Sequence, residues 1–107
     1  MGDRGNILVK ENDNDSGVYL YTHWTGSYIG NFLQEALSKK QRWDDCAYLT
    51  RIIFDTMTRD HHGKTDGFGI STFECDNNHP TLVVNVEKKT VDDGNNVFTF
   101  KEYLLIG

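Results

Sequence analysis

Short apolar runs and clusters of turn-forming residues alternate in the first part of the chain. An apolar run, Ile-Leu-Val, lies within residues 6–10, and residues 12–17 are all turn formers. Over residues 18–23 the chain places Val, Leu and Thr on one side and Tyr, Tyr and His on the other. This period of two, with β-branched and aromatic residues, is typical of a strand. The pattern predicts a β-hairpin with a loose loop.

Two amphipathic helices are predicted after the hairpin. Ser27 is a candidate N-cap, and apolar residues then recur with helical spacing to about Lys40: Ile29, Phe32, Leu33, Ala36 and Leu37. The second helix begins after Asp44 and Asp45, because carboxylates favour the positive end of a helix. Its apolar stripe is broad, which indicates a helix packed deeply against a sheet: Cys46, Tyr48, Leu49, Ile52, Ile53, Phe54 and Met57.

The second half of the chain returns to strand patterns. A strand is predicted over residues 68–73, followed by a turn at 76–80. Residues 81–87 contain a continuous apolar run, Leu-Val-Val, of the kind found in central strands. A short return strand near 90–91 and a turn at 92–96 complete this part.

The C-terminal residues predict a short helix and complete the fold assignment. Thr99 and Glu102 match a capping box, so a helix is expected over 100–105. Residues 1–5 are polar and are expected to fray. The length of the chain, residues 1–107, suits a single domain. We predict an α+β fold, an antiparallel sheet with a two-helix layer on one face, in the order β-β-α-α-β-β with room for one more strand before the terminal helix.

Charge and composition narrow the classes of function. The chain has 11 Lys and Arg against 16 Asp and Glu, a net charge of −5, so direct nucleic-acid binding is disfavoured. Cys46 and Cys75 form no Cys-x-x-Cys pair, and His61 and His62 have no spacing typical of a metal site. No signal-peptide pattern and no membrane-length apolar run is present. We expect a cytoplasmic protein without a cofactor.

The end of the hairpin carries the most distinctive residues for function. Tyr19, Tyr21 and His23 share one face of the predicted strand, and Trp24 follows at the strand-to-helix corner. We call these four residues the aromatic stripe. If the helices cover the Val-Leu-Thr side of the strand, the stripe is exposed, and exposed aromatic clusters often mark binding surfaces. With the opposite packing the tyrosines belong to the core and His23 is a hydrogen-bonded structural histidine.

The ordered set of short motifs resembles a group of known proteins. The motifs are Tyr21-Thr22-His23-Trp24-Thr25-Gly26, Arg42–Asp45, Tyr48–Phe54, Gly67–Ser71 and Asp76-Asn77. Together they are similar to small uncharacterised proteins of phages, prophages and bacterial mobile elements that carry a Tyr-x-His-Trp-x-Gly motif. The resemblance extends over residues 5–104. It implies a genomic setting and assigns no chemistry and no catalytic residue.

Three hypotheses about function follow from these observations. The first is a non-enzymatic interaction module that blocks a host protein of defence or nucleic-acid handling, with carboxylates that engage a basic groove: Asp44, Asp45, Asp76, Asp92 and Asp93. The second is a homo-oligomer, such as a homodimer, that binds or sequesters a nucleotide or other small ligand through the aromatic stripe. The third is a minimal hydrolase with His23 as acid or base. No catalytic residue pattern is assembled in the sequence, which favours the first hypothesis and a protein that is not an enzyme.

Overall fold

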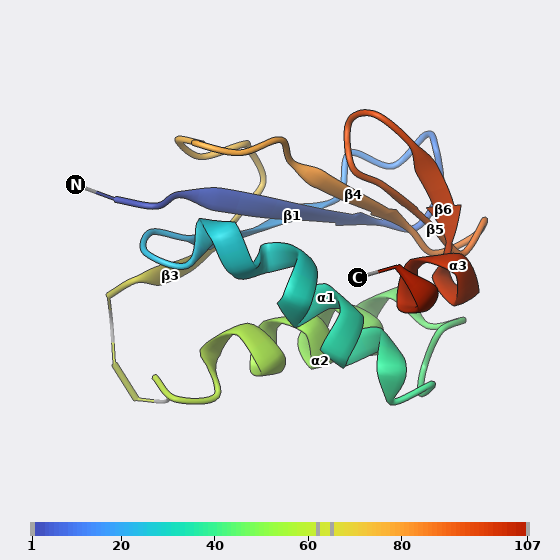
Figure 1. The fold of residues 1–107 in the computed structure, drawn as a ribbon, viewed down its shortest axis with the longest axis horizontal. Coiled ribbons are helices and arrows are strands. Elements are labelled where there is room, and N and C mark those ends of the chain that lie inside the picture. Colours follow the sequence, from blue (N-terminus) through green and yellow to red (C-terminus); the bar gives the residue numbers. More distant parts are fainter. Residues whose placement is uncertain (1, 62, 65, 107) are drawn as a thin grey trace.

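The computed structural model describes residues 2–61, 63–64 and 66–106, and it consists of one layer of strands and one layer of helices (Figure 1). This confirms the predicted α+β class and, apart from the short strand β6 that the sequence analysis did not predict, the order of helices and strands. The elements are β1 (Gly5–Lys10), β2 (Val18–Thr22), the 3₁₀ turn η1 (Gly26–Tyr28), α1 (Ile29–Ser38), α2 (Cys46–Thr58), β3 (Phe68–Ser71), β4 (Leu82–Asn85), β5 (Thr90–Asp92), β6 (Val97–Thr99) and α3 (Phe100–Leu105).

The strands form one sheet in the order β3-β2-β1-β4-β5-β6. All neighbours in this sheet are antiparallel except β1 and β4, which are parallel, so the expectation of a fully antiparallel sheet is corrected at that pair. β3 runs in the same direction as β1, because both are antiparallel to β2, and β4 pairs with the free side of β1. The loop 72–81 returns the chain to the starting end of the sheet, as a parallel pairing requires.

One face of the sheet packs on α1 and α2 and forms the core. Ile7 pairs with Leu20 on β2 and with Leu82 on β4, and the next pair of residues along, Val9 and Val84, lies on the same face. All these side chains are buried together with the apolar sides of the helices: Ile29, Leu33, Ala36, Leu37, Leu49, Ile53 and Met57. The helical spacing in the sequence therefore identified the buried sides of both helices, except that Tyr48, which was included in the stripe of the second helix, is exposed.

The beginnings of the two helices differ in how they are capped. Asp45 caps α2, because its side chain accepts a hydrogen bond from the Tyr48 amide at 3.2 Å, and the helix begins after Asp45 as predicted. Ser27 does not cap α1. It lies inside η1, and its hydroxyl donates to the Asp3 carboxylate at 2.6 Å.

The N-terminal segment is anchored at residues 3–5, in contrast to the fraying that its polar composition suggested. The Asp3 amide donates to the His23 carbonyl at 2.8 Å, and the Gly26 amide donates to the Asp3 carbonyl at 2.6 Å. The Arg4 amide donates to Asn78 Oδ1 at 2.8 Å. These partners come from distant parts of the chain, so the local sequence gave no sign of them.

The capping box of α3 gives a test of the fold. Thr99 Oγ1 accepts from the Glu102 amide at 3.0 Å, and Glu102 Oε1 accepts from the Thr99 amide at 2.8 Å. We expect Thr99→Ala to lower the free energy of unfolding by about 1 kcal/mol, because an N-terminal amide of α3 loses its partner. Thr99→Ser keeps the hydroxyl and is the control. Urea denaturation measures both, and equal loss in the two variants would contradict the role of the cap.

Candidate functional site

The helices cover the Leu20 and Thr22 side of β2, and this decides between the two packings that the sequence left open. Both side chains are fully buried. The aromatic stripe therefore lies on the opposite, helix-free face of the sheet and at its corner. Tyr19, Tyr21 and His23 are half-buried, and Trp24 is 51% exposed.

The stripe residues are in contact with one another. The Tyr21 hydroxyl lies 2.8 Å from His23 Nδ1, and the rings of His23 and Trp24 meet edge to face with centroids 4.9 Å apart. Burial raises the pKa of Tyr21 above its ordinary value, so its hydroxyl stays protonated at neutral pH. Among the described residues no carboxylate is hydrogen-bonded to His23, so the partner that a hydrolase would need at this ring is absent from that set.

Trp24 rests on the backbone that leads into β3. A Cβ added to Gly67 would lie 2.8 Å from Trp24 Cζ3, and Gly67 has a φ of +86°. The His23 amide also donates to the Gly67 carbonyl at 2.9 Å. Gly67 thus meets two requirements at once, a left-handed backbone and close contact with the indole ring. Glycine beside or within a strand often marks such a close approach of the backbone.

The edge strand β3 and the residues after it carry exposed apolar side chains, with Ile70 on the helix side of the sheet opposite Leu20. Ile70 in β3 is 60% exposed, and Phe73, just after the strand, is also exposed. Neither was among the candidate site residues from the sequence. The signal that could have identified Ile70 is an uncharged strand, Phe-Gly-Ile-Ser, between Asp66 and Glu74.

The loop 72–81 crosses the helix-free face beside the stripe. Asn6, fully buried in β1, holds this loop through both ends of its amide: Nδ2 donates to the Cys75 carbonyl at 3.2 Å, and Oδ1 accepts from the Cys75 amide at 3.3 Å. Asp76 in this loop lies 3.6 Å from the Arg4 guanidinium. The side chain of a β1 residue therefore fixes the loop that carries Asp76 next to the stripe.

The other predicted carboxylates lie elsewhere. Asp44 pairs with Lys89 Nζ at 2.7 Å, and Asp45 is engaged in capping α2. Lys89, the partner of Asp44, comes after the end of β4, and this end pairs with Lys10 at the end of β1. Asp76 lies at the opposite end of β1, where it pairs with Arg4. The structure thus brings Asp76 to the aromatic stripe and separates Asp44 and Asp45 from it.

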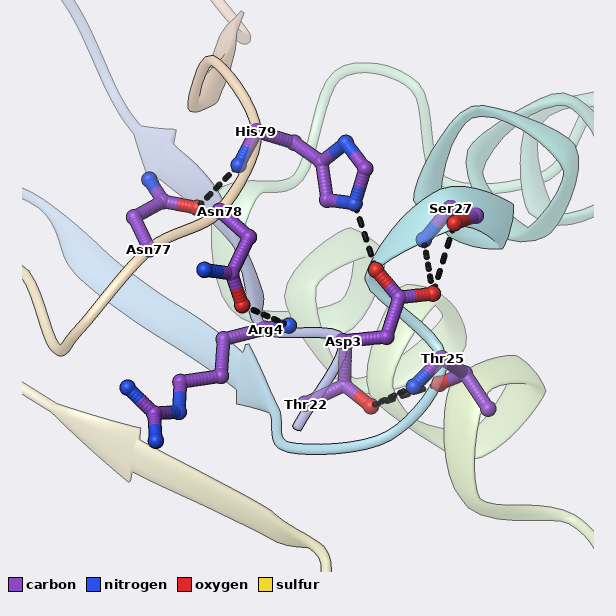
Figure 2. A network of polar contacts seen from close by, with 8 residues as sticks. All are labelled: Asp3, Arg4, Thr22, Thr25, Ser27, Asn77, Asn78 and His79. Carbon is purple, nitrogen blue, oxygen red and sulfur yellow. Dashed lines mark hydrogen bonds and ion pairs between the residues drawn. The ribbon is translucent and has the colours of Figure 1, made fainter. Parts of the chain in front are cut away.

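A polar cluster that the sequence did not predict lies at the base of the stripe (Figure 2). Asp3 Oδ2 accepts from the Ser27 amide at 2.9 Å and from its hydroxyl at 2.6 Å, and Asp3 Oδ1 lies 2.5 Å from His79 Nε2. The hydrogen bonds from Ser27 and His79 lower the pKa of Asp3 to about 2. No spacing rule relates these three residues, since they come from the N-terminus, η1 and the crossing loop.

The order of groups in this cluster is unlike that of a catalytic triad. In a triad the imidazole lies between the hydroxyl and the carboxylate and takes the hydroxyl proton. Here the carboxylate of Asp3 lies between Ser27 and His79, as Figure 2 shows. A carboxylate with so low a pKa is also a weak base. The cluster is therefore a clamp that joins three chain segments beneath the stripe.

Metal binding has no support in the described part of the chain. Within residues 2–61, 63–64 and 66–106, no three His, Cys, Asp or Glu side chains are grouped so as to hold a metal ion. His62, one of the adjacent histidines considered from the sequence, lies outside the described residues.

None of the described helices has both the length and the apolar composition needed to cross a bilayer.

Comparisons with protein families, with curated proteins and with solved structures found nothing that matches this chain. The function must therefore be argued from the geometry of the site itself.

The contact between Gly67 and Trp24 can be tested with a matched pair of glycines. Gly63 also has a positive φ, +81°, but a Cβ added there meets no atom of the described residues within 4 Å. Gly63→Ala should cost about 1–2 kcal/mol from backbone strain alone. Gly67→Ala should cost more, because the new methyl group also displaces the indole ring. Thermal unfolding measures the cost, and a shift in Trp24 fluorescence is expected for Gly67→Ala only. Equal effects would show that the ring contact contributes nothing.

The Asp3 clamp predicts a stability change at acidic pH. Because the pKa of Asp3 in the folded protein is about 2, below the ordinary 3.8, the clamp stabilises the fold above about pH 4 and is lost as the pH falls towards 2. We expect Asp3→Asn to lower the unfolding temperature at about pH 5 and the difference from the unmodified protein to shrink towards pH 2. Asp66→Asn, at an exposed carboxylate away from the clamp, is the control. A difference that stays constant with pH would contradict the clamp.

Proposed function

We propose that this protein is a non-enzymatic binding module that holds a partner protein on the aromatic stripe and the adjoining edge of the sheet. The observation that carries the proposal is the position of Trp24, half exposed and supported from below by the backbone at Gly67. Tryptophan and tyrosine side chains on rigid supports are the residues that most often dominate the binding energy of protein interfaces.

The surroundings of the stripe favour a protein over a small ligand. Small molecules bind in concave sites that bury most of their surface. Four hollows among the described residues are lined by other side chains, at the end of α2, over β4 to β6, near Trp43 and beside Arg42. The stripe lies outside all of them, which suits contact with another macromolecular surface.

The charge and the resemblance to phage-type proteins suggest the kind of partner. A net charge of −5 attracts a basic surface, such as one that normally holds nucleic acid. Asp76, beside the stripe, adds an exposed carboxylate at the contact region. The partner in this proposal is a cytoplasmic host protein with a basic groove, which the module blocks.

A pair of exposed aromatic residues provides the test. Trp24 and Tyr48 are equally exposed, at 51% and 52%, but Tyr48 lies on α2, away from the stripe. The tagged protein is used to capture partners from a bacterial host lysate, and the captured protein is then purified for titration. We expect Trp24→Ala to weaken the binding by about 2 kcal/mol or more, roughly thirtyfold, and Tyr48→Ala to leave it unchanged.

Two results would count against the proposal. Equal binding by both variants would remove the stripe from the interface. A change in Trp24 fluorescence on titration with nucleotides, abolished by Tyr21→Phe and His23→Ala, would instead favour the small-ligand hypothesis.

A further inference from the structure

The outer edge of β3 presents unpaired backbone groups. His23 and Gly67 form a hydrogen-bonded pair, and in an antiparallel ladder such pairs alternate with pairs that exchange no hydrogen bond. Phe68 and Ile70 are therefore the residues whose N–H and C=O groups point away from β2. No hydrogen bond among the described residues uses them. Such a row of donors and acceptors is a template for an added strand.

A hollow of about 350 Å³ lies directly beside this edge on the helix side of the sheet. Its described lining comes from the end of α2, from the described residues between α2 and β3, and from the start of β3, and it includes Phe54, Thr58, His61, Lys64, Asp66 and Phe68. The rings of His61 and Phe68 meet with centroids 5.1 Å apart and form one wall. In an added strand, the side chain opposite Phe68 would project on the same face of the sheet, towards this hollow.

From these two features we infer that β3 accepts an extended segment of the partner protein, which extends the sheet by one strand and places an apolar side chain in the hollow beside Phe68. Backbone hydrogen bonds would supply affinity, and the hollow would select the side chain. The inference rests on the proposed function, because Trp24 stands at the end of the same strand, against Gly67.

The charged residues nearest to the two ends of β3 are carboxylates, which favours an occupant with basic flanks, whereas Lys64 lies farther along the loop and lines the hollow. Asp66 precedes the strand and Glu74 follows it, and neither forms an ion pair among the described residues. A second copy of the chain is a poorer occupant. In the antiparallel register that places Ile70 opposite Ile70, Asp66 of one copy would lie opposite Glu74 of the other, and two copies would also each carry a net charge of −5, so like charges repel. Lysine or arginine residues at both ends of a partner segment would meet these carboxylates favourably.

The test uses a display library of peptides of about seven residues, the length of a typical strand, selected on the full-length protein. We expect enriched peptides with alternating apolar positions and basic ends. The best peptide is then synthesised for titration. Added salt should weaken its binding, because the flanking contacts are between exposed charges.

Two proline variants provide a matched comparison at the two edges of the sheet. Ile70 and Val97 are equally exposed, at 60% and 61%, and each directs its N–H outward from an edge strand. Ile70→Pro should weaken the peptide at least about tenfold, through a lost hydrogen bond and crowding at the edge. Val97→Pro should leave its affinity unchanged.

A second measurement does not depend on the folding of any variant. Two forms of the peptide are N-methylated at alternate amides. In one form the methyl groups replace the N–H donors that face β3, and in the other they replace the donors that face solvent. Only one of the two methylated peptides should lose binding. The amides of Phe68 and Ile70 should also exchange more slowly with solvent when the unmethylated peptide is bound.

The outcomes separate this inference from the proposed function. Loss of the captured partner in Trp24→Ala but not in a folded Ile70→Pro would leave the proposed function intact and overturn strand addition. Retention by both variants would overturn both. An absence of enriched peptides, or equal binding of the two methylated peptides, would also overturn strand addition. A dimer of the protein alone that Ile70→Pro dissociates would assign the edge to a second copy instead.

Discussion

The burial of the Leu20 and Thr22 side of β2 under the two helices is the interaction on which the rest of the structure depends. Side chains alternate along a strand with a period of two, so burial of one side turns the other side to the opposite face. A buried threonine needs a partner for its hydroxyl, and the Thr22 and Thr25 hydroxyls lie 2.5 Å apart. That contact also shapes the corner at which Trp24 projects. The position of the aromatic stripe is thus a consequence of core packing.

Polar contacts between distant segments give the stripe a rigid base. The Asp3 carboxylate joins residues that are 24 and 76 positions away, and the Asn6 amide holds a backbone group 69 positions away. Asp3 and Asn6 lie at or near the same end of β1. The Asp3 amide also positions His23, because it donates to the His23 carbonyl. Contacts of this kind are costly to break when buried, since each removed partner leaves an unsatisfied group. They therefore support the aromatic side chains from below without occupying their exposed surface.

The two edge strands of the sheet, β6 and β3, differ in whether their outward backbone groups are satisfied. At β6 the chain turns at once into α3, and the outward amide of Thr99 is satisfied by the Glu102 side chain. At β3 no comparable contact covers the outward groups of Phe68 and Ile70 among the described residues. Natural proteins usually protect an open edge with charges, proline or a covering segment. An uncharged edge next to an exposed tryptophan and a hollow is consistent with a surface that another chain covers.

The sequence by itself determined the local elements of this protein, and the tertiary structure decided how they face one another. The cap at Asp45, the capping box at Thr99 and the central apolar run that became β4 were all readable, because each depends on residues only a few positions apart. The exposed side of β2, the parallel pairing of β1 with β4 and the Asp3–His79 contact were not. Each of these depends on which distant segments pack together, and period-two alternation is equally compatible with either face of a strand.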